Sequence, residues 1–195
     1  MYSKNLVLLF FLAVFFSACE QTYQPKEKGY PRFDLPTPHY APVTGDHPYS
    51  FEVSDFASVS RDSSRLAEPH WINIDYPSLG GVVSITYKEV DHDLVKLNKY
   101  IEDSRTLISK HNVKAYGIEE TTIKTAQGQK AFVFALTGQV PTQFQFYTTD
   151  SSKHFLRGAL YFRTAMENDS LAPAIQYISH DMLHLLNTLK WKNGQ

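Results

Sequence analysis

The chain has 195 residues, and its 19 basic and 20 acidic side chains give a formal net charge of −1 at neutral pH. This balance provides neither the basic surface that binds nucleic acids nor a polybasic patch for anionic lipids. The chain holds one cysteine, Cys19, which excludes intramolecular disulfide bonds and thiolate metal clusters. Its 13 phenylalanines and 12 tyrosines are enough to build a hydrophobic core.

Residues 1–18 have the features of an export signal. Lys4 precedes the apolar run LVLLFFLAVFFSA at residues 6–18, which is too short to span a bilayer as a helix. Small side chains stand directly before Cys19, and this arrangement resembles a bacterial lipobox. The resemblance implies that Cys19 becomes the N-terminus and carries acyl chains such as palmitate, in which each buried methylene contributes about 0.8 kcal/mol. The alternative is an ordinary secretory signal that ends near a cysteine.

Residues 19–48 are predicted to form a lipidated tether. Six of the ten prolines lie in this segment, and proline at that density favours extended polyproline II structure of about 3 Å per residue. The stretch GYPRFDLP at residues 29–36 is too aromatic for a plain spacer, so we expect it to dock on the domain or on a partner. Residues 49–192 are predicted to form a single α/β domain.

The first half of this domain is predicted to contain strands and then a helix. The strands are rich in β-branched and aromatic residues and are expected over Ser50–Val59, Trp71–Asp75 and Gly81–Lys88. From Asp93, a suitable N-cap, to Asn112, apolar side chains recur at helical spacing. The predicted apolar face begins at Leu94, and Ser104 at its centre indicates close approach to the sheet.

The second half is predicted to contain four strands and a helix. The strands are expected over Ile118–Thr125, Lys130–Thr137, Gln143–Thr148 and His154–Arg163. Short turns between them indicate an antiparallel meander. The final helix is expected over Leu171–Trp191, where apolar residues repeat at intervals of four and three.

This order of elements indicates an α+β domain. We expect a mainly antiparallel sheet flanked by two amphipathic helices, as an α/β/α sandwich, because each helix has one apolar stripe that the sheet must cover. The order resembles the Mog1/PsbP-like fold. A fold by itself does not give a function.

His180 and His184 form the sharpest candidate for catalytic chemistry. Their spacing could let one metal ion bind both rings, as in the HExxH motif, and Asp181 stands where that motif has Glu. On a helical wheel, however, both histidines face away from the apolar stripe, so we expect them to be exposed to solvent. A metallohydrolase that uses His180 and His184 stays open as a remote alternative.

Four other histidines, His39, His47, His70 and His92, lie in predicted loops without metal-ligand spacing, and we expect surface positions for them. The sequence has no GxSxG, P-loop or GxGxxG motif. We therefore predict no catalytic residues, no metal and no cofactor.

Arg157 lies within the apolar strand FLRGALYF at residues 155–162. A charge in such a strand is unfavourable unless it is paired. One interpretation is a structural salt bridge under the helix, with Glu102, Asp103 or Glu119 as the carboxylate. The other is a guanidinium that binds a ligand or a partner at the sheet.

Several segments together resemble one protein family. They are PKEKGY (25–30), LP (35–36), WINI (71–74), IEDSR (101–105), FYTTDSSKHFLRGALYF (146–162) and NDSLAP (168–173). With a lipobox in front of them, the chain resembles the gliding motility lipoprotein GldD of Bacteroidota from Cys19 nearly to Trp191.

The resemblance implies a non-enzymatic component or assembly factor of the gliding machinery, which works together with type IX secretion. We expect a cell-envelope protein with a lipid anchor in a membrane, a domain that faces the periplasm, and partners among other gliding and secretion proteins. The candidate partner-binding side chains are Tyr30, Phe33, Arg105, Lys153 and Arg157. The alternative from another class is a periplasmic module that binds a peptide or a glycan on the aromatic sheet face.

Overall fold

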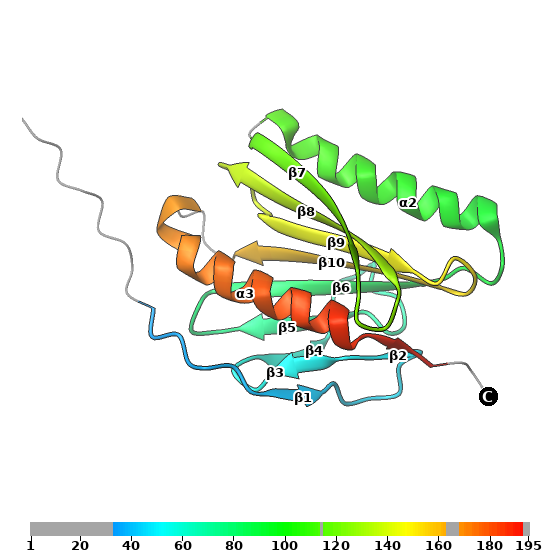
Figure 1. The fold of residues 1–195 in the computed structure, drawn as a ribbon, viewed down its shortest axis with the longest axis horizontal. Coiled ribbons are helices and arrows are strands. Elements are labelled where there is room, and N and C mark those ends of the chain that lie inside the picture. Colours follow the sequence, from blue (N-terminus) through cyan, green and yellow to red (C-terminus); the bar gives the residue numbers. More distant parts are fainter. Residues whose placement is uncertain (1–32, 114, 163–167, 193–195) are drawn as a thin grey trace, which may run out of the picture.

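The computed structural model describes residues 33–113, 115–162 and 168–192, and a seven-stranded antiparallel sheet forms their centre (Figure 1). The strands are β4 (Ser58–Arg61), β5 (Ile72–Tyr76), β6 (Gly81–Glu89), β7 (Ala115–Lys124), β8 (Lys130–Gly138), β9 (Phe144–Thr149) and β10 (His154–Phe162). Their order across the sheet is β4-β5-β6-β10-β9-β8-β7. The predicted four-strand meander is therefore confirmed, and pairing of β6 with β10 joins it to the earlier strands.

One helix packs on each face of the sheet, which confirms the predicted α+β class (Figure 1). Helix α2 (Leu94–Ser109) starts at the predicted N-cap, since the Asp93 carboxylate accepts the backbone N–H groups of Val95 and Lys96. The 3₁₀ helix η1 (Lys110–Val113) continues it, and α3 (Asn168–Thr188) covers the other face. None of the described helices is long and apolar enough to cross a membrane.

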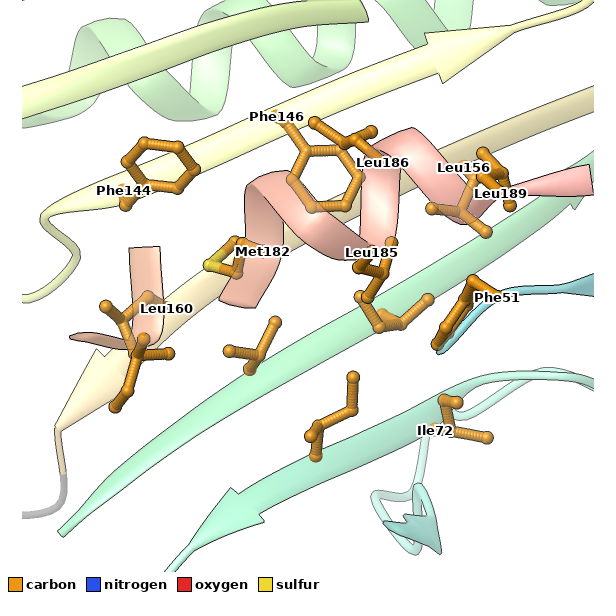
Figure 2. Packing of buried hydrophobic residues seen from close by; sticks show 14 of the residues in the cluster. Phe51, Ile72, Phe144, Phe146, Leu156, Leu160, Met182, Leu185, Leu186 and Leu189 are labelled. Atoms are coloured by element: carbon orange, nitrogen blue, oxygen red, sulfur yellow. The ribbon is translucent and has the colours of Figure 1, made fainter. Parts of the chain in front are cut away.

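The alternating pattern of the strands separates two apolar clusters. Phe146 and Leu156 pack with Met182 of α3, whereas Tyr147 and Phe155 pack with Leu97 of α2. Figure 2 shows the cluster under α3, where the leucines of the helix contact β9 and β10.

Ser104 is buried at the α2 interface, as predicted, but Leu94 is 65% exposed, so the prediction that it joins the apolar face is wrong. It lies in the first turn of α2, beyond the part that covers the sheet.

The expected strand over Ser50–Val59 is broken into shorter pieces. The structure has β2 (Tyr49–Ser50) and β3 (Glu52–Ser54), and the next strand, β4, begins at Ser58. A turn separates β3 from β4, and in it the N–H of Ala57 donates to the carbonyl of Ser54. The single long strand was therefore a wrong prediction, because the alternation of apolar residues continues through a turn that reverses the chain.

Both ends of the described chain add small antiparallel pairs to the domain. β1 (Tyr40–Pro42) pairs with β3, and β11 (Lys190–Trp191) pairs with β2 (Figure 1). The pairing of β11 ends α3 at Thr188, before the predicted end at Trp191. Phe33 packs on the apolar cluster under α3. The C-terminal part of the predicted tether thus lies against the domain.

Replacement of Gly158 by alanine tests how closely the sheet packs under α3. An alanine Cβ would lie 2.4 Å from Cε1 of Phe146, whose ring is itself buried. Overpacking of this kind costs about 1–3 kcal/mol in the free energy of unfolding. Urea denaturation should show that loss for Gly158→Ala and a smaller one for Gly117→Ala, whose nearest neighbour would be the Thr137 hydroxyl at 3.3 Å. Equal stability of the two variants would contradict the packing described.

Candidate functional site

A cleft of about 770 Å³ opens at the end of the sheet where β6 finishes and β10 begins. His154 of β10 is the register partner of Glu89 of β6, so the two strands are paired at the cleft. The other walls come from the β1–β2 loop, the β4–β5 loop and the chain after β11. Segments that are far apart in the sequence therefore meet here.

Aromatic rings form the inner surface of this cleft. His47 stacks on Tyr49 with centroids 5.1 Å apart, and His70 meets both His47 and Tyr87 edge-on at 5.6 and 5.8 Å. The ring of His154 lies 5.9 Å from that of Tyr87. We call His47, His70, Tyr87 and His154 the aromatic floor.

The fully buried Tyr49 fixes the loop that carries His70. Its hydroxyl donates to the backbone carbonyl of His70 at 2.6 Å. His70 has a φ of 69°, a left-handed conformation that is uncommon for residues other than glycine. Such a conformation persists only when the surroundings hold it, and the Tyr49 hydrogen bond does so here.

The aromatic floor contains nitrogen atoms without hydrogen-bond partners among the described residues. His154 is only 5% exposed; its Nδ1 lies 2.8 Å from the Tyr87 hydroxyl, and its Nε2 is buried and unpaired. The Nδ1 of His47 is likewise buried without a partner. Trp191 stacks on His154 at 5.0 Å, with an interplanar angle of 13°. An unpaired buried polar atom is unfavourable, so these positions favour an external partner.

Burial sets the charge state of the aromatic floor. It lowers the pKa of His154 and of His47, so both rings are neutral at neutral pH. Burial, with the nearby Glu89 carboxylate, raises the pKa of Tyr87 to about 12, which keeps its hydroxyl protonated. His47, Tyr87 and His154 are therefore uncharged rings that can form hydrogen bonds.

Charged side chains of both signs surround the floor. We call them the charged rim; they are Asp46, Glu89, Asp91, Lys153 and Lys192. All five are exposed, so they remain solvated around the opening. No group of three or more His, Cys, Asp or Glu side chains within the described residues is placed to hold a metal ion.

A tight hairpin presents Lys153 to the cleft. The Asp150 carboxylate accepts the backbone N–H groups of Ser152, Lys153 and His154. Burial acts to raise the pKa of Asp150, but these three hydrogen bonds outweigh it and hold the pKa below its usual value. Ser151 takes a left-handed φ of 63° at the tip. The hairpin is thus held by hydrogen bonds from its backbone N–H groups to the Asp150 side chain.

Of the predicted partner-binding residues, Lys153 is the one that the structure places at the cleft. Tyr30 lies outside the described residues, as does the predicted lipidation site Cys19. Phe33 is half-buried against the apolar cluster under α3, which leaves less of its ring available to a partner.

Arg105 and Arg157 lie on the α2 face of the sheet, on either side of Tyr147. Arg105 pairs with Glu120 of β7, with a closest distance of 2.6 Å, and its guanidinium lies 6.0 Å from the Tyr147 ring. Arg157, the register partner of Tyr147, donates through Nη2 to the amide oxygen of Gln145. The predicted residues are therefore not brought together into one site.

The expected salt bridge of Arg157 to Glu102, Asp103 or Glu119 is not formed among the described residues. Glu119 is the register partner of Ala135 and so lies on the opposite face of the sheet from Arg157. The side chains of Glu102 and Asp103 are exposed on α2. The half-buried guanidinium of Arg157 therefore donates to an amide oxygen and not to a carboxylate.

The surroundings of His180 and His184 on α3 differ from those of a metal site. His180 is exposed as expected, but His184 is half-buried, so solvent exposure was a wrong expectation for this residue. Its ring stacks on Tyr40 at 3.6 Å and its Nε2 lies 2.8 Å from a carboxylate oxygen of Glu52. Residues of β1 and β3 thus cover this side of α3.

The residue between the two histidines, Asp181, is buried beside this contact. Its two carboxylate oxygens accept the hydroxyls of Tyr40 at 2.8 Å and Tyr76 at 3.0 Å. Burial raises the pKa of Asp181, although both hydrogen bonds act in the opposite direction. Burial and the adjacent carboxylate also raise the pKa of each tyrosine. Asp181 therefore joins the N-terminal segment, the sheet and α3.

Sequence reasoning missed most of the cleft. His47 and His70 were expected at the surface, but both are half-buried within the aromatic floor. His154, Tyr87 and Trp191 gave no local signal, because each looks like an ordinary strand residue until the chain is folded. The left-handed backbone of His70 also distinguishes this site, but it is visible only in the structure.

Comparison with known proteins gives the family. The model of the gliding motility lipoprotein GldD family matches residues 20–191. The chain belongs to the GldD family of gliding motility lipoproteins. The matched range begins directly after Cys19 and includes both the tether and the domain. The family membership predicted from sequence is thus confirmed.

Other comparisons add little to this assignment. No curated protein sequence matches the chain. The solution structure of cyanobacterial PsbP (CyanoP) from Synechocystis sp. PCC 6803 is similar with a TM-score of 0.41 and 10% identity, over 82% of this chain and 96% of that chain. This likeness carries no information on what the GldD-family protein does.

The buried carboxylate predicts a distinctive pH dependence for Asp181→Asn. Because the folded-state pKa of Asp181 is raised, its contribution to stability is present at low pH and is lost as pH rises through that pKa. The free energy of unfolding of the wild type, relative to Asp181→Asn, should therefore increase from neutral pH to about pH 4. Urea denaturation at both pH values measures it, with Asp103→Asn on exposed α2 as the control. A relative stability that falls on acidification would show that burial does not dominate at Asp181.

Proposed function

We propose that this GldD-family lipoprotein is a non-enzymatic component or assembly factor of the gliding machinery that works with type IX secretion. The family match over residues 20–191 carries this proposal, because it includes the tether together with the domain. The family is defined by a role in motility and not by a reaction. A protein of this kind acts by placing a binding surface at a fixed position on the membrane.

The anchor in this proposal is an acylated Cys19, and the domain faces the periplasm. The path of the tether supports such a role, since Tyr40 is held on α3 by Asp181 and His184. A chain that leaves the domain from a fixed point restricts how the domain is oriented toward the membrane. Arg105, Lys153 and Arg157 remain the proposed contacts for other envelope proteins, with Tyr30 and Phe33 in the tether.

A second candidate function is a periplasmic binding module. The cleft at the end of β6 favours it, because its volume of about 770 Å³ falls within the range of small-molecule sites. The two candidates are compatible, since a subunit of the machinery can also carry a ligand. Different measurements distinguish them. The first candidate predicts that protein partners are captured, and the second predicts that a ligand raises the stability of the domain.

The first candidate predicts that the anchor is needed for partner capture. Tagged wild type and Cys19→Ala, the latter exported by a cleavable secretory signal in place of residues 1–18, would be crosslinked in native cells and purified. We expect gliding or secretion proteins with the wild type and their loss with Cys19→Ala, measured by mass spectrometry beside the gliding phenotype.

A third strain provides the control for this experiment. It carries Cys19→Ala behind an unrelated membrane-spanning helix, which restores attachment to a membrane without the acyl chains. Recovery of partners in this strain would show that attachment is the requirement. If the anchored wild type captured no gliding or secretion protein, the machinery role would be contradicted.

A further inference from the structure

We propose that the cleft formed by the aromatic floor and the charged rim binds a neutral, polyhydroxylated ligand, the end of a glycan chain. This inference rests on the second candidate function, a binding role for the cleft, and does not depend on the link to secretion. The size, the charge and the unpaired groups of the cleft indicate the ligand class.

The cleft has the composition of a ligand site. Its volume of about 770 Å³ accommodates a short oligosaccharide, and rings form its inner surface while polar groups surround the opening. The rings of His47, His70, Tyr87 and His154 are in mutual contact, so the floor is formed before any ligand enters. Aromatic faces suit the C–H surface of a sugar ring, which is apolar although its edge carries hydroxyls.

The charges of the rim favour a neutral ligand. Three carboxylates and two ammonium groups surround a floor in which burial keeps His47 and His154 uncharged. Such a mixture produces no strong field of one sign, so it would not concentrate anions or cations. It does provide many acceptors and many donors side by side. Hydroxyl groups both donate and accept, and a polyol can therefore bond to both kinds of rim residue.

The unpaired nitrogens of the floor point to the same chemistry. His154 is buried and lines the cleft, but its Nε2 has no partner among the described residues. In one tautomer this atom donates and in the other it accepts. A sugar hydroxyl completes either arrangement, whereas a carboxylate suits only the donor and an ammonium only the acceptor.

A peptide fits this position less well. Extended peptides commonly bind by adding a strand to an open sheet edge. At the cleft the sheet presents β6 and β10, which are interior strands paired on both sides. β2 and β11 pair with each other at the same end. β6 and β10 therefore offer no free edge, and β2 and β11, with 2 residues each, are too short to pair with an extended peptide.

Fluorescence of Trp191 tests the proposal directly, because its ring stacks on His154 at 5.0 Å. The full mature lipoprotein would be held in a polyoxyethylene detergent, which has no sugar headgroup to compete. It would be titrated with neutral oligosaccharides of glucose, mannose and N-acetylglucosamine. The chain has two tryptophans, so Trp191→Phe assigns the signal. We expect saturable quenching by at least one neutral oligosaccharide and its loss in Trp191→Phe.

Variants of the rim and the floor locate the binding. Lys153→Ala and Glu89→Gln change exposed side chains and leave the core intact, and each should weaken binding about tenfold. His154→Gln tests the buried nitrogen and is read together with a circular dichroism spectrum to confirm folding. Lys130→Ala, which changes an exposed lysine that does not line the cleft, is the matched control and should bind as the wild type does.

Three results would overturn the proposal. Preferential binding of uronic-acid oligosaccharides or of short peptides would leave a binding role for the cleft but refute the neutral glycan. Absence of quenching by every oligosaccharide and peptide would refute both the ligand class and the binding function. Equal weakening in Lys130→Ala and Lys153→Ala would also contradict it, because the effect would not arise at the cleft.

Discussion

The buried carboxylate of Asp181 is the interaction on which the arrangement of this lipoprotein depends. A carboxylate removed from water is unfavourable unless hydrogen bonds compensate it, and the hydroxyls of Tyr40 and Tyr76 supply them. One hydroxyl comes from β1 and the other from β5, whereas the carboxylate belongs to α3. These contacts fix the C-terminal part of the predicted tether to both the sheet and the helix.

The cleft is built on the path of that segment. After β1 the chain continues into the loop that contributes His47, and β2 then pairs with β11, which positions Trp191 beside His154. A wall of the candidate ligand site is therefore formed by the N-terminal part of the described chain. Under the proposed function, with Cys19 acylated, this connection would restrict the orientation of a bound ligand relative to the membrane.

Much of the fold could be predicted from sequence because its signals are periodic. Alternation in Gln143–Thr148 separates Phe146, which packs under α3, from Tyr147, which packs under α2, and the structure confirms this division although it buries both faces of the strand. The helical spacing from Leu171 to Leu189 identifies the face of α3 that packs on the sheet. The short strands near Tyr49 have no such repeat. Asp181 was seen only as part of a histidine motif, since its tyrosine partners are distant in the sequence. The cleft could not be predicted, because it assembles side chains from residue 46 to residue 192 that share no local pattern.

Hydrogen exchange of backbone amides tests most directly the claim that the C-terminal part of the predicted tether is an integral part of the domain. The N–H of Val43 donates to Phe51 and that of Asp55 donates to His39, both at 2.8 Å. We predict that these amides are protected to a similar degree as those of β5 and β6 in the mature lipoprotein. Exchange at the rate of an unfolded peptide, while β5 and β6 stay protected, would contradict the account and leave the cleft without one of its walls.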